Sequence, residues 1–271
     1  MLSPVQEKLL EMLKWFHEYC KENHLQYYVV GGTMLGAVRH GGFIPWDDDV
    51  DVVLPRPDYE RLLSELQGKK GKYLLETFAL GNKDYFYAYA KLYDTGTTFT
   101  EKARRICRRG IYIDIFPLDG VGATEAERDK NFKRFDRINM FLMTRTCAIM
   151  RRRGLAKNIA IVISRMIPSF LLDDHKLLRK VDAVAASFGY EDSKYVGNLM
   201  GVYRKKEIME KKIFGQPTEY PFEDIVVNGV ERYEEFLTNL YGDWRQLPPE
   251  EKRVSLHDYL ELDLKRSWMD V

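Results

Sequence analysis

Cysteine is scarce in this chain, and its scarcity excludes one class of fold. Cys20, Cys107 and Cys147 are the three cysteines among 271 residues, and no two of them form a C-x-x-C motif. An odd number of widely spaced cysteines does not support a disulfide framework. The cysteine content is therefore typical of a protein from a reducing compartment.

The chain also has almost no net charge. It contains 42 Lys and Arg against 41 Asp and Glu, which gives a formal net charge of +1. A near-neutral balance argues against binding nucleic acid through overall charge, so we expect no nucleic-acid partner. The 271 residues, with 45% hydrophobic content, can supply a large buried core.

A long uninterrupted hydrophobic run is missing as well. The first residues, MLSPVQEKLLEMLKW, alternate charged and apolar side chains and lack the apolar core of a signal peptide. The most apolar segment, residues 154–172, is broken by polar residues and Pro168, so it is a poor membrane-spanning helix. It is either a core helix or a basic amphipathic element that lies on a membrane surface beside the three arginines at 151–153. We predict a cytoplasmic protein, and the second interpretation would place it at the inner face of the membrane.

The most informative stretch that is present runs from Gly31 to Asp51, GGTMLGAVRHGGFIPWDDDVD. The residues before it, QYYVV at 26–30, are aromatic and β-branched and predict a buried strand that leads Gly31 and Gly32 into a tight turn. Thr33 is the expected N-cap of a helix that extends to about Arg39. A strand, a glycine turn and a helix N-terminus form a candidate anion cradle of backbone N–H groups.

Carboxylates follow this stretch at once. Strand periodicity puts Asp47, Asp49 and Asp51 on one face, while Val50 and Val52 point into the core. At an effective dielectric near 20, like charges about 4 Å apart repel by about 4 kcal/mol. Such a group is solvated, shares a proton or holds a cation, and hard oxygen ligands suit Mg²⁺ or Mn²⁺. A solvated acidic loop is the alternative, but the apolar strand pattern favours the metal site.

Two later segments predict strands that carry one charged side chain each. In IYIDIFPL, residues 111–118, Asp114 is a lone carboxylate in an apolar strand, which is costly unless it is paired or bound to a metal. Asp114 is therefore the predicted third carboxylate of the site. In YFYAYAKLYD, residues 85–94, the odd positions form an aromatic face that includes Lys91. Either Lys91 contacts phosphate and Tyr85 and Tyr87 line a pocket, or a helix covers this face.

The remaining periodicity sets the expected fold. Helices are predicted over residues 4–23, after Pro57, over 124–150 and 154–170, and from Asp173 to about 188. We expect an α+β fold with a mixed sheet, flanking helices and an added helical region. The predicted divisions are a catalytic core at 1–121, a helical insertion at 122–195 that faces the acceptor or a membrane, and a C-terminal region at 196–271 that packs on the core.

A strand, a Gly-Gly turn, a helix, a D-x-D strand and a later strand carboxylate are together the pattern of the nucleotidyltransferase (polymerase-β-like) fold. The runs GGTMLGAVRHGGFIPWDDDVDV and GIYIDIFPLDG resemble the LicD family, whose bacterial members are phosphocholine transferases and which includes the fukutin-type proteins. A weaker likeness extends to KLYDTGTTF and EEFLTNLYGDWRQLPP. Unlike the fukutin-related members, this chain has no evident zinc-ligand cluster or N-terminal anchor.

The resemblance implies a role for particular residues. Asp49 and Asp51 match the metal-binding carboxylates and Asp114 the third one, so all three are the predicted catalytic and metal residues, with Mg²⁺ or Mn²⁺ as the cofactor. The matched phosphate cradle is Gly31, Gly32 and Thr33. Arg39 and His40 would lie near the substrate.

The implied enzyme is a phosphotransferase that moves phosphocholine from CDP-choline to a sugar hydroxyl of a teichoic acid or another cell-wall or cell-surface glycan or glycolipid precursor. Choline is a quaternary ammonium, and each aromatic face that holds it contributes roughly 0.5 to 2 kcal/mol. The candidate rings are Trp46, Tyr85, Tyr87, Tyr112 and Phe116.

Other functions stay open from the sequence. The same fold could use a nucleoside triphosphate or another CDP-alcohol, and a protein of a different class could bind nucleotide or choline without catalysis. A P-loop kinase is excluded, because no lysine follows the glycines of GGTMLGAVR. The sequence leaves the acceptor sugar and the oligomeric state open.

Overall fold

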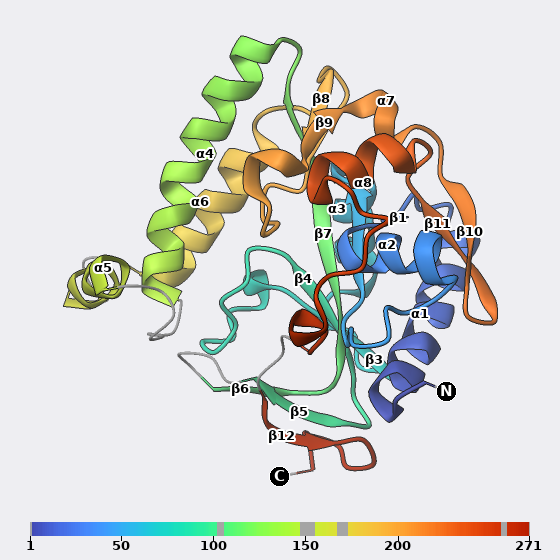
Figure 1. The fold of residues 1–271 in the computed structure, drawn as a ribbon. Coiled ribbons are helices and arrows are strands. Elements are labelled where there is room, and N and C mark those ends of the chain that lie inside the picture. Colours follow the sequence, from blue (N-terminus) through green and yellow to red (C-terminus); the bar gives the residue numbers. More distant parts are fainter. Residues whose placement is uncertain (1, 102–105, 147–154, 167–172, 256–258, 271) are drawn as a thin grey trace.

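The computed structural model describes residues 2–101, 106–146, 155–166, 173–255 and 259–270. A mixed sheet forms its centre (Figure 1). The strand order along this sheet is β10 (Thr218–Phe222), β11 (Ile225–Gly229), β1 (Tyr28–Val29), β2 (Asp51–Pro55), β7 (Tyr112–Gly122), β4 (Ala90–Asp94) and β3 (Tyr73–Glu76). The far end of β7 pairs with β8 (Tyr195–Gly197), which pairs with β9 (Ile208–Glu210).

The strands β2 and β7 lie in the middle of this sheet and run parallel. Their apolar residues have almost no exposed surface: Val52, Val53 and Leu54 of β2, and Ile113 and Ile115 of β7, are all 0% exposed. Strands whose two faces are both covered read as continuous hydrophobic runs, as these do. The predicted strand at 111–118 is confirmed, and its burial fixes the backbone that carries Asp114.

Two helices close to the chain start pack against these strands. The helix α1 (Pro4–Glu22) begins with a capping box between Ser3 and Gln6 and buries an apolar stripe that includes Leu13 and Phe16. The helix α3 (Arg56–Leu66) carries Pro57 in its first turn, where a missing N–H costs nothing. Both predicted helices are confirmed.

A helical arm follows β7. It consists of α4 (Glu125–Thr146), α5 (Leu155–Met166) and α6 (Asp174–Ala186), and α4 and α6 lie side by side at the left of Figure 1. Asp173 caps α6 by accepting a hydrogen bond from the His175 N–H at 2.8 Å. The three predicted helices are confirmed within the described residues, while residues 151–153 lie outside them. Along the described ranges, no helix combines the length and apolar character needed to cross a bilayer.

The C-terminal part returns to the sheet and adds a second one. The strands β10 and β11 form a hairpin, α7 (Lys211–Phe214) and α8 (Tyr233–Tyr241) lie beside the first sheet, and β12 (Tyr259–Asp263) pairs with β5 (Thr98–Glu101). β5 also pairs with β6 (Cys107–Arg109), and residues 102–105 between them lie outside the described residues. The predicted α+β fold with a mixed sheet is confirmed, and the divisions after residues 121 and 195 stay predictions.

Two local predictions are wrong. The strand predicted over 85–94 begins only at Ala90, which pairs with Ile115 of β7. Two residues further along β7 lies Pro117, which has no N–H and so cannot donate a hydrogen bond that would extend the pairing with β4. The helix predicted from an N-cap at Thr33 begins at Gly31, directly after Val30. Thr33 is therefore inside the first turn, and its hydroxyl has another role.

Candidate active site

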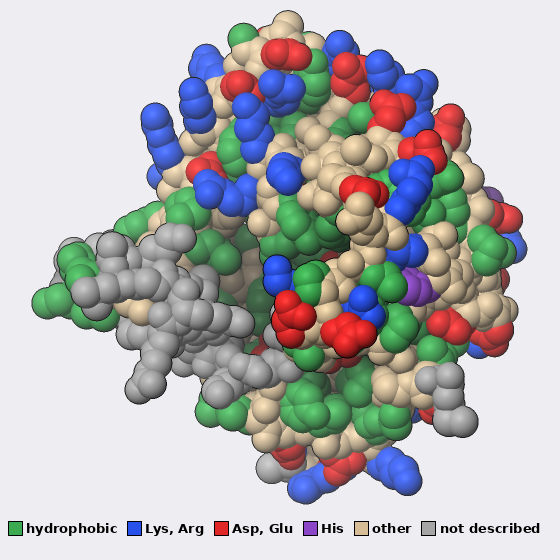
Figure 2. Space-filling view, viewed as in Figure 1, with side chains coloured by type: hydrophobic (Ala, Val, Ile, Leu, Met, Phe, Trp, Pro, Cys, Tyr) green, Lys and Arg blue, Asp and Glu red, His purple; other side chains and the backbone are tan. Residues whose placement is uncertain are grey.

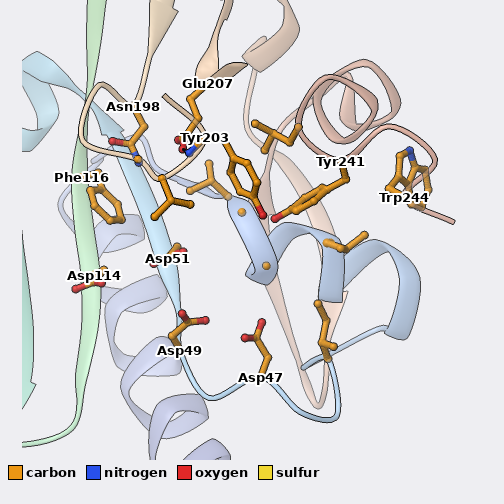
Figure 3. A pocket seen from close by; sticks show the side chains of 18 of the residues that line it. Asp47, Asp49, Asp51, Asp114, Phe116, Asn198, Tyr203, Glu207, Tyr241 and Trp244 are labelled. Atoms are coloured by element: carbon orange, nitrogen blue, oxygen red, sulfur yellow. Dashed lines mark hydrogen bonds between the residues drawn. The ribbon is translucent and has the colours of Figure 1, made fainter. Parts of the chain in front are cut away.

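A cavity of about 710 Å³ opens at the edge of the central strands. Two stretches of the chain line it, and Figure 3 shows them facing each other. We call the lining residues from 30–116 the carboxylate wall and those from 198–254 the C-terminal wall. The carboxylate wall includes Gly31, Gly32, Arg39, Trp46, Asp47, Asp49, Asp51, Tyr87, Tyr89, Lys91, Glu101, Tyr112, Asp114 and Phe116; the C-terminal wall includes Asn198, Tyr203, Glu207, Tyr241, Asp243 and Trp244.

Three charged side chains stand in one row across the sheet. In the parallel pair β2–β7, Asp51 is opposite Asp114, and in the antiparallel pair β4–β7, Lys91 is opposite the same Asp114. Neighbouring strands lie about 4.8 Å apart, so side chains on the same face at matched positions are in contact range. The predicted convergence of Asp51 and Asp114 from two separate strands is present, and Asp49 lines the same cavity just ahead of β2.

The two glycines at the start of α2 (Gly31–His40) are required by these carboxylates. Gly31 has φ +55°, and a Cβ on it would lie 3.2 Å from Asp51 Oδ2; a Cβ on Gly32 would lie 2.6 Å from Asp47 Oδ2. A larger residue at position 32 would displace Asp47, and one at position 31 would also strain the backbone. The first turn of α2, whose leading N–H groups lack partners within a helix, therefore lies directly against the acidic side chains.

The acidic cluster carries more negative charge than its surroundings favour. Burial, followed by repulsion from Asp49, Asp114 and Asp47, raises the pKa of Asp51 well above its ordinary value. Burial likewise raises the pKa of Asp114 to about 6, although Lys91 opposes the shift. Both effects favour a proton or a cation at this point.

Lys91 serves as the internal counter-charge of Asp114. Its side chain is 1% exposed, and Nζ lies 3.0 Å from Asp114 Oδ1 and 3.8 Å from a Glu101 oxygen. The same Nζ lies 3.4 Å from the ring centre of Tyr112 and 4.2 Å from that of Tyr87. The hydroxyls of Tyr112 and Tyr87 both donate to Glu101. Lys91, one of whose predicted roles is a phosphate contact, therefore lines the cavity, but its positive charge is already paired with Asp114 and Glu101.

Other side chains position the acidic segment from behind. The Thr33 hydroxyl accepts a hydrogen bond from the Asp51 N–H at 2.9 Å and is buried away from the cavity. Gln6 of α1 donates through Nε2 to the backbone oxygens of Asp47 at 2.9 Å and Ile44 at 3.3 Å. Sequence reasoning missed Gln6, because nothing in the pattern of α1 indicates a contact about forty residues away.

Not every predicted substrate residue reaches the cavity. Arg39 and Trp46 line it, and Arg39 Nη1 donates to the Trp244 backbone oxygen at 2.9 Å, which links the two walls. His40 is exposed and lies outside the lining. Tyr85 is 0% exposed, and its hydroxyl donates to the Tyr89 backbone oxygen at 2.7 Å, so it belongs to the core. The predicted strand would have kept Tyr85 on the face of Lys91, and the loss of that strand removes it.

The C-terminal wall was not predicted at all. Glu207 accepts a hydrogen bond from the Tyr203 N–H at 2.9 Å, and burial raises the pKa of Glu207 to about 7. Figure 3 shows Tyr203, Tyr241 and Glu207 on the side of the cavity that faces Asp51 and Asp47. The sequence around Glu207, YRKKEIM, has no motif that signals a site.

The donor set suits a hard divalent cation that is shared with a substrate. Within the described ranges, no three acidic, histidine or cysteine side chains converge into a complete ligand cluster. Mg²⁺ usually takes only one or two protein carboxylates and fills its other positions with water and phosphate oxygens. The adjoining Asp51 and Asp114, with Asp49 beside them, fit such a partial set, and burial together with repulsion among these carboxylates raises the pKa of Asp51.

The mixed sheet with flanking helices, and the paired strand carboxylates next to a glycine-led helix, define a nucleotidyltransferase-type domain. Residues 24–141 match the family model described as LicD/FKTN/FKRP, nucleotidyltransferase domain. Over 251 residues, which cover 92% of each protein, the chain is 30% identical to the lipopolysaccharide cholinephosphotransferase LicD of Haemophilus influenzae. The chain belongs to the LicD family.

A shorter match involves uncharacterised proteins of two Rickettsia species. The protein of Rickettsia prowazekii is 44% identical over 50 residues, which is 18% of this chain and 19% of that protein. The protein of Rickettsia typhi is 44% identical over 50 residues, which is 18% of this chain and 16% of that protein.

Proposed function

We propose that this chain is a cholinephosphotransferase that moves phosphocholine from CDP-choline to a hydroxyl group of a cell-surface glycan precursor. The observation that carries the proposal is the row formed by Asp51, Asp114 and Lys91 at the floor of a cavity, in a chain that aligns along 92% of its length with a lipopolysaccharide cholinephosphotransferase. The relative's acceptor is a lipopolysaccharide by its name. For this chain we propose a teichoic acid or a related glycolipid precursor as the acceptor.

The proposal includes a divalent metal. Asp51 and Asp114, with Asp49, would hold Mg²⁺ or Mn²⁺, which would neutralise the diphosphate of the donor as charge builds on the departing CMP. Lys91 keeps Asp114 oriented through the 3.0 Å ion pair, and Thr33 keeps the Asp51 backbone in place. The N–H groups of the first turn of α2 would donate to the non-bridging phosphate oxygens.

The acceptor hydroxyl must lose a proton as its oxygen attacks phosphorus. A general base works best when its pKa lies near the operating pH. Asp114 is one candidate, but a bound cation would lower its pKa. Glu207 faces the acidic cluster from the other wall, and burial raises its pKa to about 7. We therefore assign the base role to Glu207.

The test is direct. Purified protein with CDP-choline, Mg²⁺ and a glycolipid acceptor should release CMP and give a phosphocholine-modified product by mass spectrometry. The matched control is Asp51→Asn. Release of pyrophosphate from a nucleoside triphosphate, or turnover of another CDP-alcohol without any turnover of CDP-choline, would overturn the proposal in favour of the alternative activities.

We also propose that α5 contacts an anionic membrane surface, where a lipid-linked acceptor would be found. Ile159, Val162, Ile163 and Met166 recur at helical spacing and are all exposed, with Met166 at 76%. Figure 2 shows hydrophobic side chains at the outer end of this arm and Lys and Arg on the neighbouring part of the molecule. Between Asp136 and Asp173 the sequence contains no Asp or Glu and seven Lys and Arg residues. An apolar stripe in basic surroundings suits the interface of an anionic bilayer.

Vesicle co-sedimentation tests this contact. The protein should sediment with phosphatidylglycerol vesicles and much less with phosphatidylcholine vesicles. The double variant Ile159→Ser, Ile163→Ser should lose the interaction, while the matched variant Val226→Ser, Leu260→Ser, which changes exposed apolar residues elsewhere, should retain it. Equal sedimentation of the two variants would refute a role for α5.

A further inference from the structure

Several aromatic rings line the cavity, and they differ in whether a Lys or Arg side chain of the protein already faces them. Among the described residues that line the cavity, the aromatic side chains are Trp46, Tyr87, Tyr89, Tyr112, Phe116, Tyr203, Tyr241 and Trp244. A quaternary ammonium is bound by the negative faces of such rings. A ring that already faces a cation of the protein is a poor partner for a second one, because the two positive charges repel.

Most of these rings already face a cation. Lys91 Nζ lies 3.4, 4.2 and 5.8 Å from the ring centres of Tyr112, Tyr87 and Tyr89. The two tryptophans are paired in the same way: Arg253 lies 5.7 Å from the ring of Trp46, and Arg245 lies 4.3 Å from that of Trp244. Three of the five rings predicted from the sequence to hold choline, Trp46, Tyr87 and Tyr112, therefore already face a cation of the protein itself.

Two rings on the C-terminal wall differ from these. Within the part of the chain that the structure describes, Phe116, Tyr203 and Tyr241 are the lining rings without a Lys or Arg over them. Phe116 is only 7% exposed and lies 4.2 Å from the Tyr89 ring, so its surface is largely used. Tyr203 is 38% exposed and meets Tyr241 at 5.2 Å and 79°. The two rings form a corner of the cavity wall.

The charge around this corner suits a cation. In Figure 3 the two tyrosines extend toward the start of α2, with Asp51 and Asp47 on the far side and Glu207 next to Tyr203. Burial first, then the charge and hydrogen bond of Tyr203, and after these the acids Asp51 and Asp47, raise the pKa of Tyr241. A cation here would gain ring contacts and carboxylates together.

We propose that the corner formed by Tyr203 and Tyr241 binds the quaternary ammonium of the donor, while Tyr87 and Tyr112 hold Lys91 in place. This assignment rests on the proposed function, because it states where the choline group of that donor lies. It also locates substrate selection outside residues 24–141, the part that matches the family model.

A neutral analogue of the donor distinguishes recognition of the positive charge from recognition of the shape. CDP-3,3-dimethylbutanol replaces the trimethylammonium of CDP-choline with an uncharged group of the same shape. The wild-type protein should favour CDP-choline in kcat/KM, and Tyr203→Leu and Tyr241→Leu should each reduce this preference about 2- to 30-fold. Tyr203→Phe and Tyr241→Phe retain the ring and should retain the preference. The matched control Tyr87→Leu should lower activity with either donor and leave the preference unchanged.

The preference of these variants for the charged donor shows which wall binds the ammonium group. Loss of the preference in Tyr87→Leu, or its persistence in both leucine variants, would overturn the assignment. If no acceptor supports CMP release from either donor, the proposed function fails, and calorimetric binding of the two CDP compounds to the same variants still tests the corner. A wild-type protein that binds the charged and neutral compounds equally well would then refute it.

Discussion

The two walls of the cavity are built in different ways. The carboxylate wall stands on central strands whose apolar residues are fully buried, and strand pairing holds its charges Asp51, Asp114 and Lys91 in register. The C-terminal wall consists of a 3-10 turn at Arg204–Glu207, the end of α8 and the loop after it, and its Val202 is 85% exposed. Sites on rigid elements hold reacting groups precisely, and loops are where binding preferences vary. This difference supports the proposal that phosphoryl transfer depends mainly on the first wall, with Glu207 of the second wall as the base, and that substrate choice depends on the second.

Removing one charge from the carboxylate wall should have the largest effect on activity. Asp51→Asn is expected to lower kcat by a factor on the order of 10³ or more, because the cation and the phosphate charge lose a ligand. The same change removes a buried charge and the repulsion from its neighbours, which together raise the pKa of Asp51, so the metal-free variant should melt at an equal or higher temperature. CMP release and thermal melting check the two effects. A variant that is both inactive and less stable would show that Asp51 is structural.

Removing the buried arginine that links β2 to β7 below the carboxylate wall should destabilise the protein. Arg56 follows β2 directly and pairs with Asp119 of β7 at 2.7 and 2.9 Å and with Asp182 of α6 at 2.9 Å. Arg56→Met leaves Asp119 buried without its partner and should destabilise the protein by about 3 to 5 kcal/mol in urea unfolding. The control is Arg245→Met, next to Trp244 of the C-terminal wall, because the ion pair of Arg245 with Glu234 is exposed and should contribute less than about 1 kcal/mol. Equal losses of stability in the two variants would contradict the proposed difference between the walls.

The next largest effect on activity is expected at Glu207, the residue of the C-terminal wall that is proposed as the general base. Glu207→Gln should lower kcat about 10²-fold with little change in KM, because the base acts only as the hydroxyl is deprotonated. The limb of the pH profile near pH 7 should disappear in this variant, since the pKa of Glu207 is raised to about 7. An unchanged pH profile would return the base role to Asp114.

Acidity should weaken metal binding at the first wall by a smaller, graded amount. A bound cation would compete with protons for Asp114, whose pKa burial raises to about 6, so Mn²⁺ affinity should fall as the pH drops through 6, by at most about tenfold per pH unit for the proton on Asp114. Lys91→Met removes the charge that opposes this shift and should move the midpoint to higher pH. Titration of Mn²⁺ followed by electron paramagnetic resonance measures both curves. A flat affinity from pH 5 to 8 would contradict metal ligation by Asp114.

The carboxylate wall was predictable because its signals are local. Alternation along two apolar strands placed Asp51 and Asp114 on their faces, and the glycine pair marked the turn beside them. The register that puts Lys91 next to Asp114 depends on strand pairing, which alternation does not reveal, so neither interpretation of Lys91 from the sequence included this ion pair. The sequence misplaces Tyr85 because its period-two pattern begins several residues before the first residue of β4, Ala90.

The C-terminal wall gave no comparable signal. Tyr203 and Glu207 lie in a segment without a motif, Tyr241 lies in the run EEFLTNLYGDWRQLPP, whose weaker likeness to the family indicates no role for it, and about ninety residues or more separate all three from Asp114 along the chain. Their position follows from how β8, β9 and α8 pack on the sheet, which only the tertiary structure contains. Thr33 shows the same limit on a smaller scale, because its capping propensity was outweighed by a long-range contact with Asp51.

The contact of Gln6 with the backbone of Asp47 bears on how the protein should be produced. Gln6 reaches this loop from the first turn of α1, and Ser3 fixes that turn through the capping box. An affinity tag or a truncation that unwinds these few residues would release the acidic loop and silence the enzyme while every cavity side chain stays in the sequence. Fusions for assay are best separated from Ser3 by a cleavable linker.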